Sequence, residues 1–118
     1  MALTPELTEH LLSPRHAGAL EGPCGAGMGE NAACGDVLEV QARFGQDGLE
    51  LAWRATGCGA VLAVASLGAA ELVGLDRDAV RAFDLDARVE EAGGLDRRSS
   101  HAVKVFERAL AGALASTP

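Results

Sequence analysis

Two cysteines and one aspartate stand where the chain could bind a metal ion. Cys34 and Cys58 are each followed directly by a glycine, and Asp36 comes two residues after Cys34. Structural cysteines usually occupy apolar runs, whereas glycine permits the tight backbone turns that metal sites and reactive thiols need. Because thiolates are soft ligands that suit zinc and iron–sulfur clusters, these residues predict a metal site.

Alternating polarity around these residues predicts the hairpin that positions them. Apolar and polar side chains alternate over residues 36–44 and again over 49–55, with a turn at 45–48 between them. Cys34 precedes the first strand and Cys58 follows the second, so antiparallel pairing brings both thiols and Asp36 to one edge of the sheet. A helix predicted over 60–73 begins just after Cys58, and its positive end favours the thiolate.

His101 is the candidate for a fourth donor. It lies at the start of the last predicted helix, whose apolar stripe must pack on the sheet and would bring His101 to the same edge. The alternative is an ordinary first-turn residue, solvated or capping the helix. Ser99 and Ser100 are candidate N-caps of this helix.

The remaining pattern predicts an α+β fold, with a single domain over residues 1–118 and the helices packed on one face of the sheet. Thr4 is expected to cap a first helix that ends at Pro14, and Asp76 a short helix over 79–83.

Residues 21–33 are predicted to form a mobile glycine-rich loop. Cys24, within that loop, is either a passenger thiol or a substitute third sulfur. His10 and His16 are expected to be surface or structural residues, and Glu90 and Glu91 part of a solvated loop.

Composition excludes several classes of function. The 118 residues carry 17 Asp and Glu against 10 Lys and Arg, giving a net charge of −7, and only 3% are aromatic. Binding to nucleic acid or to anionic lipid needs clustered cations, so neither partner is expected. The most apolar run, 59–70, is too short to span a bilayer, and the first twelve residues lack the pattern of a signal peptide. We therefore expect a cytoplasmic protein with reduced cysteines.

Three motifs, in order, resemble those of the IscU/SufU/NifU-type iron–sulfur cluster assembly scaffolds. Residues 8–20 are similar to the family's H-x-x-N-P-R-N-x-G-x-L opening, 31–36 to N-P-x-C-G-D, and 56–60 to G-C-G-x-A. The resemblance runs from about residue 6 to residue 114. It implies the family's three-stranded antiparallel sheet, with an extra short strand near Ala19 and Leu20.

The resemblance also implies a function, that of a scaffold rather than an enzyme. Such a protein accepts sulfur from a cysteine desulfurase, binds iron, assembles a transient [2Fe–2S]-type cluster and passes it to apo-proteins. The ligands implied are Cys34, Asp36, Cys58 and His101, with Asp36 the labile one. Cys34 is the expected persulfide acceptor, and the protein is expected to be a monomer or a transient dimer.

Two departures from the family pattern bear on this reading. His101 falls where the family has its third ligand cysteine, which keeps a metal ligand but removes a sulfur. The Leu-Pro-Pro-Val-Lys stretch that engages an Hsp70-type chaperone is replaced here by residues 94–98, so that chaperone is not an expected partner.

Other functions stay open. The same four residues suit Zn²⁺ in a sulfur-transfer partner of a cysteine desulfurase. The histidine is also consistent with a divergent member that kept the fold and lost assembly. A hydrolytic metalloenzyme is disfavoured, because no Glu or His stands beside the thiols at a spacing typical of a general base.

Overall fold

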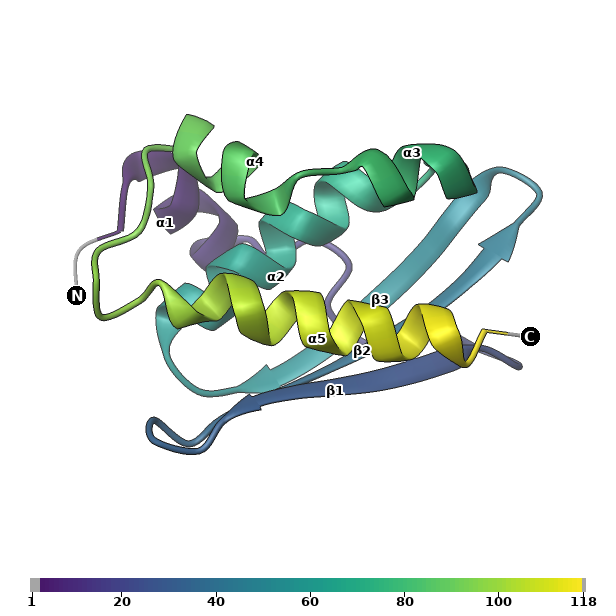
Figure 1. Cartoon of the computed structure of the whole chain (residues 1–118), viewed down its shortest axis with the longest axis horizontal. Coiled ribbons are helices and arrows are strands. Elements are labelled where there is room, and N and C mark those ends of the chain that lie inside the picture. Colours follow the sequence, from purple (N-terminus) through teal and green to yellow (C-terminus); the bar gives the residue numbers. More distant parts are fainter. Residues whose placement is uncertain (1–2, 118) are drawn as a thin grey trace.

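The computed structural model describes residues 3–117, which form one three-stranded antiparallel sheet with helices on one of its faces (Figure 1). This confirms the predicted α+β class. The elements are α1 (Pro5–Leu12), β1 (Gly25–Asn31), β2 (Asp36–Gly45), β3 (Gly48–Thr56), α2 (Gly59–Leu72), α3 (Arg77–Ala82), α4 (Leu85–Glu91) and α5 (His101–Ala115). None of the helices within residues 3–117 is long and apolar enough to cross a membrane.

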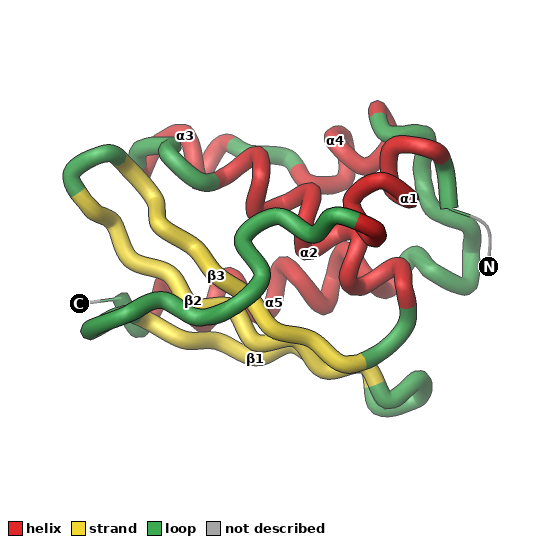
Figure 2. Tube along the Cα trace, turned by 180° about the vertical axis from the view of Figure 1, so that it is seen from behind, coloured by secondary structure: helices red, strands yellow, loops and turns green. Residues whose placement is uncertain are grey.

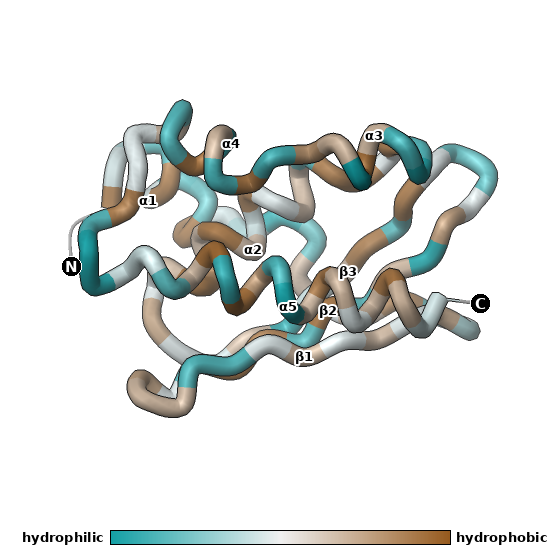
Figure 3. The backbone as a smooth tube through the Cα atoms, in the orientation of Figure 1, coloured by the Kyte–Doolittle hydropathy of each residue, from teal (hydrophilic) through white to brown (hydrophobic). Residues whose placement is uncertain are grey.

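The predicted hairpin is present as β2 and β3. The two strands pair from Val37 opposite Thr56 to Gly45 opposite Gly48. Alternate residues of both strands point to the helices and are buried, as the period of two predicts, and hydrophobic and hydrophilic residues alternate along this hairpin in Figure 3. The inward side chains are Leu38, Val40 and Ala42 of β2 and Leu49, Leu51 and Trp53 of β3.

β1 corrects the prediction that residues 21–33 form a mobile loop. Its inward positions, opposite the core residues of β2, are Gly25, Gly27 and Gly29, and all three are buried. A Cβ atom on any of them would overlap a backbone carbonyl oxygen of α5. The helix backbone therefore lies directly on the strand, and only glycine leaves room for it.

After α1 the chain runs along the free edge of β3 at residues 16–18 and then crosses the sheet face opposite the helices (Figure 2). Gln41 and Arg43, on the outward side of β2, hold this segment: Gln41 Oε1 accepts from the N–H of Leu20 at 2.8 Å, and Arg43 donates to the carbonyl oxygen of Glu21. A single parallel bridge joins Ala17 to Trp53, whose Nε1–H donates to the carbonyl oxygen of Arg15 at 2.7 Å. The third strand predicted near Ala19 and Leu20 is thus wrong, and β1 takes its place.

Three of the five helices, α1, α3 and α4, begin at a residue whose side chain caps the helix. Thr4 caps α1 by accepting from the N–H of Leu7, and Asp76 caps α3, as predicted. Asp84 caps α4, a helix that was not predicted from the sequence; Glu90 and Glu91, predicted to lie in a solvated loop, form its exposed last turn. Ser100 occupies the N-cap position of α5, but its hydroxyl donates to the carbonyl oxygen of Arg97, so the predicted serine side-chain cap is wrong.

A buried histidine fastens α1 to α2. His10 Nδ1 lies 2.7 Å from the hydroxyl of Ser66 on α2 and 3.1 Å from Nη1 of Arg15. The hydroxyl of Ser66 also accepts from the backbone N–H of Arg15 at 2.9 Å. Because a guanidinium group only donates, Nδ1 must accept, and the arrangement requires a neutral imidazole. His10 is therefore structural, whereas His16 is exposed.

This network predicts a loss of stability in mild acid. Burial, followed by the charge of Arg15, lowers the pKa of His10 below its usual 6.5. The unfolded chain therefore takes up a proton at a higher pH than the folded one, and the stability is complete above pH 6.5 and falls as the pH drops below it. Urea unfolding between about pH 7.5 and 5.5 should show this slope, and His10→Gln should flatten it. His16→Gln is the matched control, and an unchanged slope in His10→Gln would contradict the assignment.

Candidate metal centre

The four residues predicted to bind metal meet at one end of the sheet, although they belong to three separate parts of the chain. Cys34 lies in the turn before β2, Asp36 is the first residue of β2, Cys58 is the N-cap of α2, and His101 is the first residue of α5. The sulfur of Cys34, a carboxylate oxygen of Asp36 and a ring nitrogen of His101 lie within 4.8 Å of one another. Cys58 Sγ lies 3.8 Å from Asp36 Oδ2 and 3.9 Å from His101 Nε2.

Asp36 is the centre of this cluster. Its side chain is fully buried; Oδ1 accepts from the backbone N–H of Cys58 at 2.8 Å, and Oδ2 lies 2.7 Å from His101 Nε2. Gly57 makes this possible, because a side chain there would overlap Oδ1 and its φ of +146° is one that other residues rarely adopt. The turn from β3 into α2 therefore closes directly over the carboxylate.

His101 is oriented by the loop that precedes α5. Its Nδ1 lies 2.9 Å from the carbonyl oxygen of Arg98, an atom that only accepts, so Nδ1 carries a hydrogen and Nε2 faces the cluster. The short contact between Nε2 and Asp36 then holds one proton, which a metal ion would replace. A backbone carbonyl on the far nitrogen of an imidazole is the usual support of a histidine ligand.

Cys34 is the exposed member of the set. Asn31 shapes the turn around it: the side-chain oxygen of Asn31 accepts from the N–H of Ala33 at 3.2 Å, and its backbone oxygen accepts from the N–H of Cys34 at 3.1 Å. The amide group of Asn31 also points at the sulfur, 3.9 Å away. Asn31 was not among the predicted site residues, although an Asn just before a turn is a recognisable signal.

Cys24 is not part of the centre. It precedes Gly25, which pairs with Ala42, whereas the centre lies at the other end of β1, where Asn31 pairs with Asp36. The extended strand of seven residues separates the two ends by about 20 Å. The reading of Cys24 as a substitute third sulfur is therefore wrong, and all three cysteines are free thiols.

Two thiols, one carboxylate and one imidazole make a mixed donor set. Such a set suits zinc or iron, since both accept sulfur and nitrogen ligands. Cys34 is exposed, while Cys58 and His101 are half-buried. The centre therefore has a rigid floor, Asp36, and an open side through which a metal or a sulfur donor can approach.

Comparisons with known proteins point to one family. A model of the family described as the NifU-like N terminal domain matches residues 2–117. Among solved structures, the N-terminal part of a nitrogen-fixing NifU-like protein from Brucella abortus superposes with a TM-score of 0.60 at 19% identity, covering 88% of this chain and 74% of that one. A putative iron-sulfur cluster assembly scaffold protein for the SUF system from Fervidobacterium islandicum gives 0.63 at 15% identity, covering 88% and 79%. At these identities the structures show a shared fold.

Curated relatives carry related names. The chain is 45% identical over 64 residues to the bifunctional protein NifU/MnmA of Rubrobacter xylanophilus, a match covering 52% of this chain and 13% of that protein. It is 26% identical over 103 residues to an iron-sulfur cluster assembly scaffold protein IscU of Archaeoglobus fulgidus, covering 86% and 67%. The chain thus spans a small part of the first relative and about two thirds of the second.

Proposed function

The chain belongs to the NifU-like N terminal domain family, and on that premise we propose that it is a scaffold on which an iron–sulfur cluster is assembled and from which it passes to apo-proteins. The observation that supports this most directly is the convergence of two thiols, a carboxylate and an imidazole at one open end of the sheet. The names of the curated IscU relatives describe the same activity. Because the cluster is transferred to another protein in this scheme, ligands that exchange readily suit it better than a closed and rigid set of ligands.

Cys34 is the proposed acceptor of sulfur from a cysteine desulfurase. Its thiolate attacks the outer sulfur of the enzyme's cysteine persulfide, a new S–S bond forms on Cys34, and the enzyme's thiolate leaves. This transfer involves no net oxidation. Conversion of the sulfane sulfur into sulfide takes two electrons, which a separate reductant must supply. Cys34 suits this role because it is the exposed thiol of the centre.

Iron would then be held by Cys34, Asp36, Cys58 and His101. The histidine replaces one thiolate of an all-cysteine set, and imidazole ligands raise the reduction potential of a [2Fe–2S] cluster. Anaerobic reconstitution with Fe²⁺, sulfide and a reductant tests the proposal. We expect a red-brown protein with near-equal iron and sulfide, weakened in His101→Ala and unchanged in His16→Ala. A colourless protein that retains only Zn²⁺ would favour a zinc-bound sulfur-transfer partner instead, and a protein that binds neither would favour a scaffold that lost assembly.

Asp36 is expected to speed release of the cluster. When the cargo leaves, the carboxylate and the imidazole of His101 satisfy one another again at 2.7 Å, so the emptied centre leaves no buried charge without a partner. Asp36→Asn keeps an oxygen for the N–H of Cys58 but weakens this contact and removes a ligand charge. The variant should therefore hold its cluster several-fold longer. Loss of visible absorption after mixing with an apo-ferredoxin measures the transfer, and a rate equal to that of the parent would show that Asp36 is not the labile ligand.

A further inference from the structure

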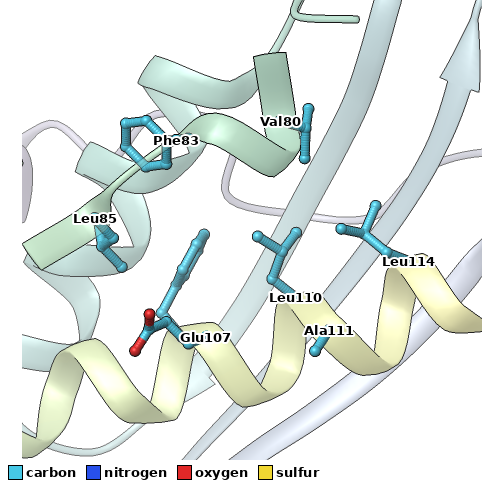
Figure 4. A pocket seen from close by; sticks show the side chains of 8 residues that line it. Val80, Phe83, Leu85, Glu107, Leu110, Ala111 and Leu114 are labelled. Atoms are coloured by element: carbon cyan, nitrogen blue, oxygen red, sulfur yellow. The ribbon is translucent and has the colours of Figure 1, made fainter. Parts of the chain in front are cut away.

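Two hollows lie along one side of α5, facing α3 and α4, and Figure 4 shows the larger of them. We call them together the α5 groove. The larger has a volume of about 210 Å³ and the smaller of about 80 Å³. Figure 4 shows Leu110 and Leu114 of α5 on one side of the larger hollow and Val80, Phe83 and Leu85 on the other. The smaller is lined by Val89, Leu95 and Val103, with Asp86, Glu90 and Ser100 at its edges.

The size and spacing of the hollows suit the side chains of a bound helix. Pockets for whole small molecules usually measure roughly 300–1,000 Å³, more than either hollow offers. Val103 in the smaller hollow and Leu110 in the larger are seven residues apart on α5, which is about 10 Å along the helix axis. Apolar side chains seven residues apart on a second helix have the same spacing, as in helix-in-groove recognition.

The charges around the groove are acidic. Asp86, Glu90 and Glu107 line it, and within residues 3–117 no lysine or arginine lines either hollow. Lys104 lies 3.8 Å from Glu107, on exposed side chains where such a pair is weak. Of the arginines of α3 and α4, Arg77 lies over the ring of Phe44 and Arg88 pairs with Glu6 and Glu71. Arg81 makes only an exposed pair with Asp78 at 3.5 Å, which is weak as well.

We propose that the α5 groove binds a basic amphipathic helix of a partner protein. Two apolar side chains of that helix, seven residues apart, fill the hollows, and its lysines or arginines pair with Asp86, Glu90 and Glu107. A second copy of this chain fits less well, because each copy carries a net charge of −7. The groove begins at Ser100, next to His101, so the bound helix would lie beside the metal centre. The inference depends on this surface alone and not on the cluster chemistry.

The test uses a fluorescein-labelled peptide of about fifteen residues with leucines at helical spacing and lysines on the other face. Fluorescence anisotropy with the full chain should give saturable binding, and a peptide with glutamates in place of the lysines should bind far more weakly. Ala111→Phe fills the mouth of the larger hollow from an exposed position, and Glu107→Lys reverses a charge on its rim. Each should weaken binding about ten-fold or more. Ala26→Phe, at an exposed position of β1 that points away from the helices, and Glu21→Lys, on the opposite sheet face, are the matched controls and should stay within about two-fold of the parent.

Several results would overturn the proposal. One is that neither peptide binds; another is that Ala111→Phe and Ala26→Phe bind alike, which would mean only diffuse attraction to an acidic protein. A third is sedimentation showing self-association that Ala111→Phe abolishes, which would assign the groove to a second copy. Cys34→Ser should bind the peptide as the parent does, so failure of the metal chemistry and failure of this surface are separable.

Discussion

Replacing Gly27 with alanine is expected to lower the free energy of unfolding by about 3 kcal/mol or more, and replacing it with valine to prevent folding. The reason is the contact between β1 and α5. A Cβ on Gly27 would overlap the carbonyl oxygen of Ala109 and crowd the backbone nitrogen of Ala113. Both belong to helix backbone, which cannot swing aside as a flexible side chain would. The helix would have to lift from the sheet and uncover its buried face, including Phe106.

Ala26→Val is the matched control for this prediction. Ala26 precedes Gly27 on the same strand, but its side chain points to the exposed face. A valine there adds more atoms than alanine does at Gly27, and β-branched residues suit strands, so stability should stay within about 0.5 kcal/mol. Urea denaturation of the three proteins gives the comparison. Equal midpoints for Gly27→Ala and the parent would show that α5 does not lie directly on β1.

Cys58→Ser is expected to weaken Zn²⁺ binding by about 100-fold or more. The substitution changes one atom and keeps the shape of the side chain, but an alcohol is a poor ligand for a metal that prefers thiolate. Competition with a chromophoric chelator measures the affinity, and circular dichroism checks that the fold is retained. The backbone N–H of Cys58 that binds Asp36 is unchanged in the variant, so the buried carboxylate keeps its partner.

Cys24→Ser makes the same chemical change at the far end of β1 and should leave the affinity as it is. A loss in both variants would point to oxidation or nonspecific thiol binding rather than to a site. If Cys58→Ser bound Zn²⁺ as tightly as the parent, Cys58 would not be a metal ligand, even though its sulfur lies 3.8 Å from Asp36 and 3.9 Å from His101.

The hairpin and the pairing of the two cysteines could be predicted because their signals are local. Apolar residues alternate along β2 and β3, and a hairpin necessarily brings its outer ends together. β1 could not be recognised in this way. Its inward residues are all glycine, which carries no hydrophobic signal and usually marks a loop. Only contact with α5, some eighty residues further along the chain, makes those glycines part of a strand.

In the candidate site, too, local signals could be predicted from the sequence and contacts between distant elements could not. Cys34, Asp36 and Cys58 were predicted from the chemistry of their side chains and the hairpin, while His101 depended on packing of the last helix and on the family resemblance. The burial of Asp36, the space left by Gly57 and the support that the carbonyl of Arg98 gives to His101 could not be predicted. Each is a contact between elements distant in sequence. The residue types involved are common, so nothing in the sequence singles these positions out. For the same reason the sequence left open whether His10 is a surface or a structural residue, since its partner Ser66 lies on another helix.

Trp53 gives this protein an optical probe of its own. The chain has one tryptophan and no tyrosine, so its near-ultraviolet emission arises from a single indole ring. That ring is buried in β3, and its N–H is bonded to the carbonyl oxygen of Arg15 in the segment that joins α1 to β1. If that segment detached, the indole would lose its partner and meet water, and its emission would move to longer wavelength. Fluorescence without any label can therefore follow this segment while the metal centre, at the end of the sheet, is loaded and emptied.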